Sequence, residues 1–386
     1  MAWFGRGGWC GCSSGIKLTP SQSLRTRRCQ LRRRLRIFYY FYRKKSQRVK
    51  KNTPISFSGT SYLGMNQHLG LRQFIVEGLE RYGNNYGGSR NGNTAPMIYR
   101  EAEDFLSKWL GVPQSVLVSS GTLAAYLIKE VITKDYECFY EPDIHPSVRI
   151  ATQEERERTD HAFRQHVFTS ILSGSRKPFA IFLNAIDPLF ALKKDFGWLT
   201  QLPKGIPLLI AIDDSHGIGV LGDKGQGIIQ QIRKLDIESF IIYGSLGKAP
   251  GIPAGFITGS NPDIVAKIKN SSIFAGASPP LPAYAYAFQE SGAILQSQLS
   301  KLMDNIRYFT RNIPSGLPLR FIADYPAFYS SDELLGRKLA RQNIIISSFA
   351  YPSKDGPLLN RIVLNAGHTR DDLDRCLEAV VKTTGI

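Results

Sequence analysis

Six short apolar runs, separated by stretches with helical spacing, constrain the fold of this chain most strongly. The runs are SVLVS, ECFYE, FAIFLN, LLIAID, FIIYG and AGFITG, at residues 115–119, 137–141, 179–184, 208–213, 240–244 and 254–259. They are apolar throughout rather than alternating, which is typical of strands covered on both faces. Segments 97–111 and 121–132, which lie between or before them, place apolar residues every three to four positions. This alternation predicts an α/β domain with a mostly parallel sheet.

The pattern changes near Pro280. A long segment with helical spacing leads into three short apolar runs and a closing helical segment, at residues 281–309, 319–323, 343–347, 361–365 and 369–382. Thr369, with Asp372 three positions later, is typical of a helix start. We therefore predict a large domain over residues 53–280 and a smaller α+β C-terminal domain over residues 281–386.

The positive charge of the chain is concentrated in its first 51 residues. Fifteen of the +17 formal charges come from Lys and Arg there, where no Asp or Glu occurs, so the remaining residues carry only +2. A nearly neutral body gives no electrostatic indication of a nucleic-acid partner. We predict that residues 1–52 form a basic arm that is disordered or the product of a mis-annotated start. An organelle-targeting segment and a membrane or nucleic-acid contact are alternative interpretations.

Apolar runs and cysteines indicate the class of protein. No apolar stretch reaches the roughly 18 residues that a membrane-spanning helix requires. The two cysteines outside the arm, Cys138 and Cys376, have no metal-ligand spacing. We therefore expect a cytoplasmic protein with no metal site and no membrane span.

Polar residues follow several of the predicted strands at the point where each strand ends. They are Ser119 to Thr122 after the first strand, His145 after the second, Asp213 and His216 after the fourth, and Ser245 and Lys248 after the fifth. The carboxyl ends of parallel strands meet at one edge of a sheet, where ligands bind. Taken singly, each group has an ordinary structural explanation, such as a helix cap, a structural histidine or a surface turn.

Together these groups have the chemistry that pyridoxal 5'-phosphate requires. A helix that opens with hydroxyl residues suits a phosphate group. The Lys248 amine can form a Schiff base, aided by the lower pKa that desolvation gives a lysine. Asp213 can pair with the protonated pyridine nitrogen and keep the ring an electron sink. One imidazole can stack on the ring, and a second can hydrogen-bond its phenolic oxygen.

Two motifs connect this interpretation with a known family. DDSHGIGVLGDKGQG (213–227) and GSLGKAPG (244–251) resemble motifs of the α-oxoamine synthases, which are fold-type-I pyridoxal phosphate enzymes with an aspartate aminotransferase-like fold. The resemblance covers about residues 53–386 and includes LLNRIVLNAGHTRDDLDR (358–375) near the C-terminus. It also implies a homodimer with sites shared across the interface.

The resemblance implies a role for individual residues at the site. Lys248 would hold the cofactor, and Asp213 would face its pyridine nitrogen. His216 would contact the phenolic oxygen, and His145 would stack on the ring. The phosphate would bind to Gly121, Thr122 and Ser245, and Arg361 would bind the substrate carboxylate. The planar guanidinium fork of an arginine suits that bidentate task. Three positions depart from the family pattern: Thr60 replaces an Asn, Tyr99 replaces a His, and Gly276 replaces a hydroxyl residue.

The resemblance further implies a reaction. An amino acid and an acyl-CoA or acyl-carrier thioester would undergo a decarboxylative Claisen condensation to an α-aminoketone, with Lys248 moving the Cα proton. An aminotransferase or aldolase on the same fold is the alternative, because Lys248, Asp213 and Arg361 would serve such an enzyme equally. A third possibility is a catalytically altered paralogue that acts by interaction through its basic arm.

Overall fold

The structure is a computed structural model, and it describes residues 54–149, 152, 159–187, 189–190, 192–350 and 356–384. The predicted basic arm, residues 1–52, lies outside the described residues. Ile55–Ile386 form one compact unit, separate from Met1–Pro54. The division of this unit into domains of residues 53–280 and 281–386 stays a prediction.

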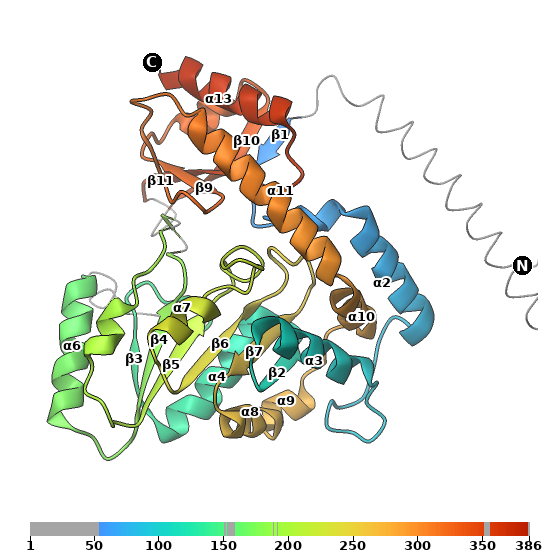
Figure 1. The fold of residues 1–386 in the computed structure, drawn as a ribbon, viewed down its shortest axis with the longest axis vertical. Helices are drawn as coiled ribbons and strands as arrows, with labels where there is room; N and C mark the ends of the chain where they lie inside the picture. Colours follow the sequence, from blue (N-terminus) through green and yellow to red (C-terminus); the bar gives the residue numbers. More distant parts are fainter. Residues whose placement is uncertain are drawn as a thin grey trace, which may run out of the picture. The chain divides into compact units, whose positions relative to one another are not determined.

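The six predicted apolar runs form the strands of one sheet, in the order β2-β7-β6-β5-β4-β3 (Figure 1). The strands are β2 (Gln114–Val118), β3 (Glu137–Tyr140), β4 (Phe179–Asn184), β5 (Leu208–Asp213), β6 (Phe240–Ser245) and β7 (Gly255–Gly259). Strands β3 to β6 pair in parallel, whereas β7 pairs antiparallel with both β6 and β2. The predicted α/β fold is thus confirmed, with β7 running against the other strands of this sheet.

Both faces of this sheet are covered by helices. Ile241 packs into a core on one face and its neighbour Ile242 into a core on the other. Contacts come from α4 (Gly121–Asp135) and α8 (Pro262–Lys269) on the first face, and from α3 (Ile98–Leu110), α6 (Asp160–Ser173) and α7 (Ile229–Lys234) on the second. Because neither face meets water, consecutive strand residues are all apolar.

A second sheet has the strand order β1-β10-β11-β9-β8. Its strands are β1 (Ile55–Phe57), β8 (Leu319–Phe321), β9 (Ala327–Ser330), β10 (Ile344–Ala350) and β11 (Leu358–Val363). The sequence indicated β8, β10 and β11, but not β1 or β9, which span only three and four residues. β1 pairs in parallel with β10, so a segment from the start of the described chain completes a C-terminal sheet.

The long helix predicted over residues 281–309 is two helices, α10 (Pro282–Glu290) and α11 (Gly292–Arg311). They meet at the buried Ser291, whose hydroxyl donates to the Phe288 carbonyl oxygen at 2.7 Å. A side-chain bond of this kind competes with the helical backbone pattern and explains the break. The further elements are η1 (Met65–Gln67), α2 (Leu69–Tyr82), η2 (Gly197–Gln201), α9 (Ser272–Gly276), α12 (Leu335–Ala340) and α13 (Arg370–Thr384).

Helix α13 begins as the sequence predicts. The Thr369 backbone N–H donates to Asp372 Oδ2 at 2.8 Å, and the Asp372 backbone N–H donates to Thr369 Oγ1 at 3.2 Å. These reciprocal bonds satisfy donors that a helix start otherwise leaves unpaired.

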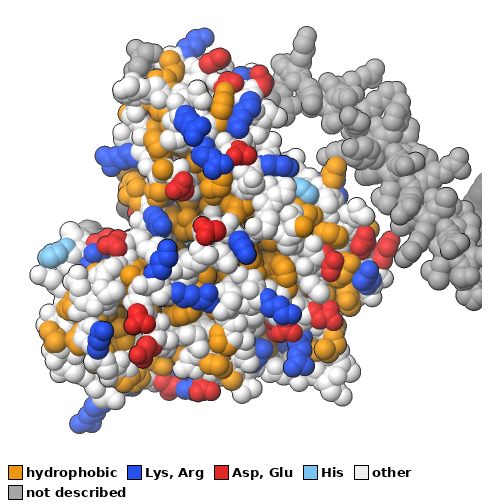
Figure 2. Space-filling view, in the orientation of Figure 1, with side chains coloured by type: hydrophobic (Ala, Val, Ile, Leu, Met, Phe, Trp, Pro, Cys, Tyr) orange, Lys and Arg blue, Asp and Glu red, His pale blue; other side chains and the backbone are white. Residues whose placement is uncertain are grey.

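The visible surface of the described chain carries both signs of charge. Figure 2 shows Lys and Arg interspersed with Asp and Glu, in keeping with the small net charge outside the first 51 residues. No helix in the described part of the chain has both the length and the apolar composition of a membrane span.

A buried ion pair ties α3 to the sheet. Arg90 Nη2 donates to Glu103 Oε1 at 2.6 Å, and the same oxygen accepts from the Leu117 backbone N–H at 2.9 Å. Both charged side chains are only 7% exposed. Removing one partner from such a pair leaves the other charge buried and unpaired.

We therefore predict that Glu103→Ala lowers the free energy of unfolding by about 3–5 kcal/mol, measured by urea denaturation. Glu101→Ala is the matched control, because Glu101 is exposed on the same helix, and it should change stability by less than about 0.5 kcal/mol. Equal effects of the two substitutions would contradict the role given to Glu103.

Candidate active site

The strand order brings the ends of β2 and β6 together. Both strands run antiparallel to β7, which lies between them, so they end at one edge of the sheet and β7 begins there. Gly121, the first residue of α4, lies so close to the β6 end that an added Cβ would be 2.8 Å from Ser245 Cβ. A larger residue at position 121 would fill the space between the helix and the strand end.

The start of α4 has the features of an anion seat. Ser120 caps the helix by accepting from the Leu123 backbone N–H at 3.1 Å. Gly121 and Thr122 contribute the first helical backbone amides, and Thr122 is exposed. The positive end of the helix dipole favours a phosphate group at this position. The structure therefore places the three predicted phosphate residues, Gly121, Thr122 and Ser245, at one point of the sheet edge.

Lys248 lies in the short connection between β6 and β7. Backbone bonds close this loop from both sides: the Leu246 N–H donates to Ala254 O, and the Ile252 N–H donates to Leu246 O, each at 2.9 Å. Burial lowers the pKa of Lys248 to about 8, although the charge of Asp213 acts in the opposite direction. Lys248 thus carries a largely desolvated amine on a loop that backbone hydrogen bonds fix, rather than lying in an exposed surface turn.

Asp213 is the last residue of β5, beside the Lys248 loop. Its Oδ1 accepts from the Ser215 backbone N–H at 2.9 Å, and Ser215 Oγ accepts from the Ser245 backbone N–H at 3.0 Å. These two bonds connect the ends of β5 and β6. The carboxylate therefore reaches the edge of the sheet in a fixed position, close enough to raise the pKa of Lys248.

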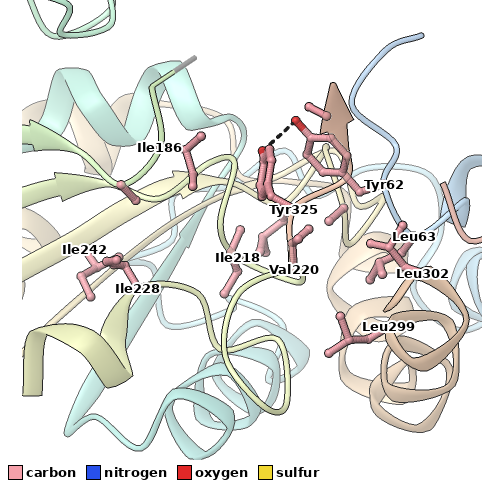
Figure 3. Packing of buried hydrophobic residues seen from close by; sticks show 14 of the residues in the cluster. Tyr62, Leu63, Ile186, Ile218, Val220, Ile228, Ile242, Leu299, Leu302 and Tyr325 are labelled. Atoms are coloured by element: carbon pink, nitrogen blue, oxygen red, sulfur yellow. Dashed lines mark hydrogen bonds between the residues drawn. The ribbon is translucent and has the colours of Figure 1, made fainter. Parts of the chain in front are cut away.

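His216 is held by two buried tyrosines. The Tyr62 hydroxyl lies 2.9 Å from His216 Nδ1. The single Tyr325 hydroxyl proton is shared between the Tyr62 oxygen at 3.1 Å and the His216 carbonyl oxygen at 3.2 Å. Figure 3 shows the two tyrosine side chains pointing toward each other. Burial lowers the pKa of His216 well below its usual value, and the charges of Lys248 and Arg361 lower it further. The imidazole is therefore neutral at physiological pH.

His145 follows β3 and is exposed. Its Nδ1 lies 2.7 Å from Ser147 Oγ and accepts from the Ser147 backbone N–H at 3.2 Å. Its charge contributes to the lowered pKa of His216, so the two imidazoles lie within electrostatic range of each other. An exposed, tethered ring at this edge is free to stack on a planar ligand.

Arg361 reaches the same site from the second sheet. It belongs to β11, and its guanidinium carbon lies 5.2 Å from the centre of the Phe349 ring. Its charge lowers the pKa of both Lys248 and His216. The other predicted site residues thus lie at strand ends of the six-stranded sheet, and Arg361, from the second sheet, lies within electrostatic range of Lys248 and His216.

Three residues at the site were missed as functional candidates by sequence reasoning. Tyr62 stands in the stretch SFSGTSYLG at residues 56–64, Asp214 is the second residue of the motif at 213–227, and Tyr325 stands in no recognised motif. Asp214 is fully buried, its Oδ2 accepts from the Ile228 backbone N–H at 2.9 Å, and burial raises its pKa well above the usual value. The motif at 213–227 was the available signal for Asp214, but nothing in the sequence distinguishes Tyr325.

Two of the departures from the family pattern have a clear structural setting. Tyr99 is buried, its hydroxyl donates to the Pro280 carbonyl oxygen at 2.8 Å, and the Arg90 guanidinium carbon lies 4.3 Å from its ring centre. Tyr99 therefore stabilises the packing of α3. Gly276 is exposed at the end of α9, with open space around the position that a side chain would take.

This set of groups fits pyridoxal phosphate. A helix start with a narrow cradle suits the phosphate, a desolvated amine suits covalent attachment, and a fixed carboxylate suits the pyridine nitrogen. The neutral imidazole of His216 and the exposed imidazole of His145 lie at the same edge of the sheet. The residue types and their placement therefore match the cofactor that the motifs imply.

The low pKa of Lys248 predicts unusual reactivity in the cofactor-free protein. A lysine reacts with trinitrobenzenesulfonate only as the neutral amine, so modification of Lys248, followed by mass spectrometry, should rise through a midpoint near pH 8. Lys267 is the control, because its ion pair with Asp135 raises its pKa. A midpoint for Lys248 at or above that for Lys267 would contradict the desolvated setting.

No family model matches the chain. The chain is 26% identical over 356 residues to a curated 8-amino-7-oxononanoate synthase of Coprothermobacter proteolyticus, covering 86% of this chain and 89% of that protein. A solved lysine-to-alanine variant of serine palmitoyltransferase from S. paucimobilis, with a bound pyridoxal phosphate–myriocin aldimine, has a TM-score of 0.73 at 16% identity, over 87% of this chain and 89% of that one. An 8-amino-7-oxononanoate synthase from Francisella tularensis has a TM-score of 0.66 at 20% identity, over 86% and 98%.

These likenesses extend over most of the chain and agree with the motifs around Asp213 and Lys248. The predicted fold and the predicted resemblance are both confirmed. The chain has the fold of the fold-type-I pyridoxal phosphate enzymes and resembles the α-oxoamine synthases in sequence over most of its length.

Proposed function

We propose that the chain is a pyridoxal phosphate-dependent acyltransferase that condenses an amino acid with an acyl thioester. The reaction releases CO2 and the free thiol and gives an α-aminoketone. The observation that carries the proposal is the desolvated Lys248 beside Asp213, at a sheet edge that also holds a phosphate seat. The names of the relatives, 8-amino-7-oxononanoate synthase and serine palmitoyltransferase, support this reaction class.

The chain's own residues would hold the cofactor at four points. Gly121, Thr122 and Ser245 would bind the phosphate, Lys248 would attach covalently, Asp213 would pair with the pyridine nitrogen, and His216 and His145 would contact the ring. When bound, the cofactor supplies an electron sink for the negative charge that develops at the amino-acid Cα. Asp213 is suited to sustain that sink because its Oδ1 is fixed by the Ser215 backbone amide.

Lys248 is suited to move the Cα proton. An amine with a pKa of about 8 has a substantial neutral fraction near neutral pH, and that fraction can accept a proton. The amine is also held within a loop closed by backbone hydrogen bonds, so it returns to the same place after each transfer.

Arg361 is suited to orient the substrate carboxylate. A guanidinium can form two parallel hydrogen bonds with a carboxylate, which fixes both the position and the plane of the group. Because Arg361 comes from the second sheet, the amino acid would lie between Arg361 and the residues of the six-stranded sheet, Lys248 and Asp213.

The chain would act as a homodimer in the cytoplasm. Three apolar side chains of α2 support self-association, because Leu69, Val76 and Leu79 are 52%, 39% and 39% exposed. Cys138 and Cys376 are free thiols, which suits a reducing compartment.

The proposed function predicts three spectroscopic and chemical results. The full chain with pyridoxal phosphate should develop the absorbance band of a lysine-bound cofactor, the band should change with one amino acid among glycine, alanine and serine, and one acyl-CoA should then release free thiol. Lys248→Ala should lose the band, whereas Lys267→Ala, an exposed control, should keep it. Transfer of the amino group without thiol release would assign the chain to the aminotransferases, and a band retained in Lys248→Ala would refute the role of Lys248.

The role of Arg361 predicts a selective effect on substrate binding. Arg361→Lys should raise the KM for the amino acid roughly 10- to 100-fold, because a charged hydrogen bond and the bidentate geometry are lost. The KM for the acyl thioester should change far less. Arg320→Lys, at an exposed position of β8, is the control, and an equal rise for both substrates would contradict a carboxylate clamp.

A further inference from the structure

The hydrogen bonds around His216 have a direction. Tyr62 and Tyr325 are only 3% and 1% exposed. Their hydroxyl groups therefore form hydrogen bonds within the protein rather than with bulk water. The Tyr325 hydroxyl has a single proton, which two acceptors share: the Tyr62 oxygen at 3.1 Å and the His216 carbonyl oxygen at 3.2 Å. If the Tyr62 oxygen accepts from Tyr325, the acceptor in reach of the Tyr62 proton is His216 Nδ1, at 2.9 Å.

This direction determines where the imidazole carries its proton. A neutral imidazole has one N–H, and a ring nitrogen that accepts a hydrogen bond has none. If Nδ1 accepts from Tyr62, the proton is on Nε2. Nε2 receives no hydrogen bond from any residue that the structure describes, so it is available to a ligand as a donor.

We propose that Tyr325 and Tyr62 are positioning residues that hold His216 as the Nε2–H tautomer, with this N–H presented to the cofactor's phenolic oxygen. The direction toward the phenolic oxygen rests on the proposed function, whereas the tautomer is a property of the chain alone. An Nε2–H group would donate a hydrogen bond to an oxygen that carries negative charge when the cofactor is attached, whereas the other tautomer would present a lone pair to it.

The hydrogen-bonded group of Tyr325, Tyr62 and His216, called the relay below, also joins three distant parts of the chain. Tyr62 precedes η1, His216 follows β5, and Tyr325 lies between β8 and β9. A bond between Tyr62 and Tyr325 spans 263 positions in the sequence, so the tautomer depends on correct placement of the second sheet against the first. The C-terminal part of the chain would thereby influence a proton at the cofactor as well as bind the substrate carboxylate.

The tautomer can be measured without activity. Magic-angle-spinning NMR of the full-length, cofactor-free protein labelled with 13C and 15N histidine distinguishes Nδ1–H from Nε2–H by the ring shifts. The chain has only six histidines, so the His216 signals can be assigned from their loss in His216→Gln. The wild-type protein should show the Nε2–H form, and an Nδ1–H form would overturn the proposal.

The role of Tyr325 has its own variant and control. Tyr325→Phe should shift the ratio of the two His216 tautomers toward Nδ1–H by roughly two- to tenfold, the effect of one neutral hydrogen bond. Tyr99→Phe should leave the ratio unchanged, because Tyr99 is equally buried at 1% exposure and also loses one hydrogen bond. A Tyr325→Phe ratio equal to that of wild type would remove Tyr325 from the relay.

Titration with pyridoxal phosphate separates this inference from the proposed function. If the Nε2–H signal of wild type shifts on cofactor binding, while Tyr325→Phe binds the cofactor with a smaller shift, both statements hold. If the cofactor fails to attach to Lys248 but the tautomer result stands, the proposed function fails and the relay remains. If the cofactor attaches and His216 is Nδ1–H, the relay is wrong and the proposed function is unaffected.

Discussion

The site depends first on the burial of the Lys248 amine next to the carboxylate of Asp213. Burial lowers the pKa of Lys248, the charge of Asp213 raises it, and the charge of Arg361 lowers it again. Burial is the largest of these effects, so removing Asp213 would lower the pKa of Lys248 further, and removing Arg361 would raise it only in part. The balance leaves an amine that can exchange its proton near neutral pH, which is the property that covalent cofactor chemistry uses.

That balance of charges is possible because each of the two sheets contributes side chains to the site. The six-stranded sheet places Asp213, Ser245 and Lys248 at successive strand ends, where backbone bonds fix them. The second sheet adds Arg361 from β11, and the segment before β9 adds Tyr325. A binding site assembled from two separately built sheets can change one substrate contact while the cofactor contacts stay in place.

Much of this arrangement was predictable because its signals are local. A strand buried on both faces is apolar at every position, so all six strands of the large sheet were found, and the motifs around Asp213 and Lys248 are continuous in sequence. The break at Ser291 was missed because a single side-chain bond decides it. β1 was missed because it owes its existence to a partner almost 300 residues away. Tyr325 was missed for the same reason, since only the tertiary structure brings its hydroxyl to Tyr62.

The antiparallel course of β7 has a consequence for how the protein folds. Since β6 and β7 are joined by a short loop and pair directly, the segment that carries Lys248 is a hairpin within a sheet otherwise built by long crossovers. A hairpin closes a small loop and can form early, whereas parallel pairs must wait for distant segments to meet. The lysine can therefore reach its native backbone conformation before Arg361 and Tyr325 arrive, so the order of assembly would separate formation of the cofactor anchor from completion of the substrate site.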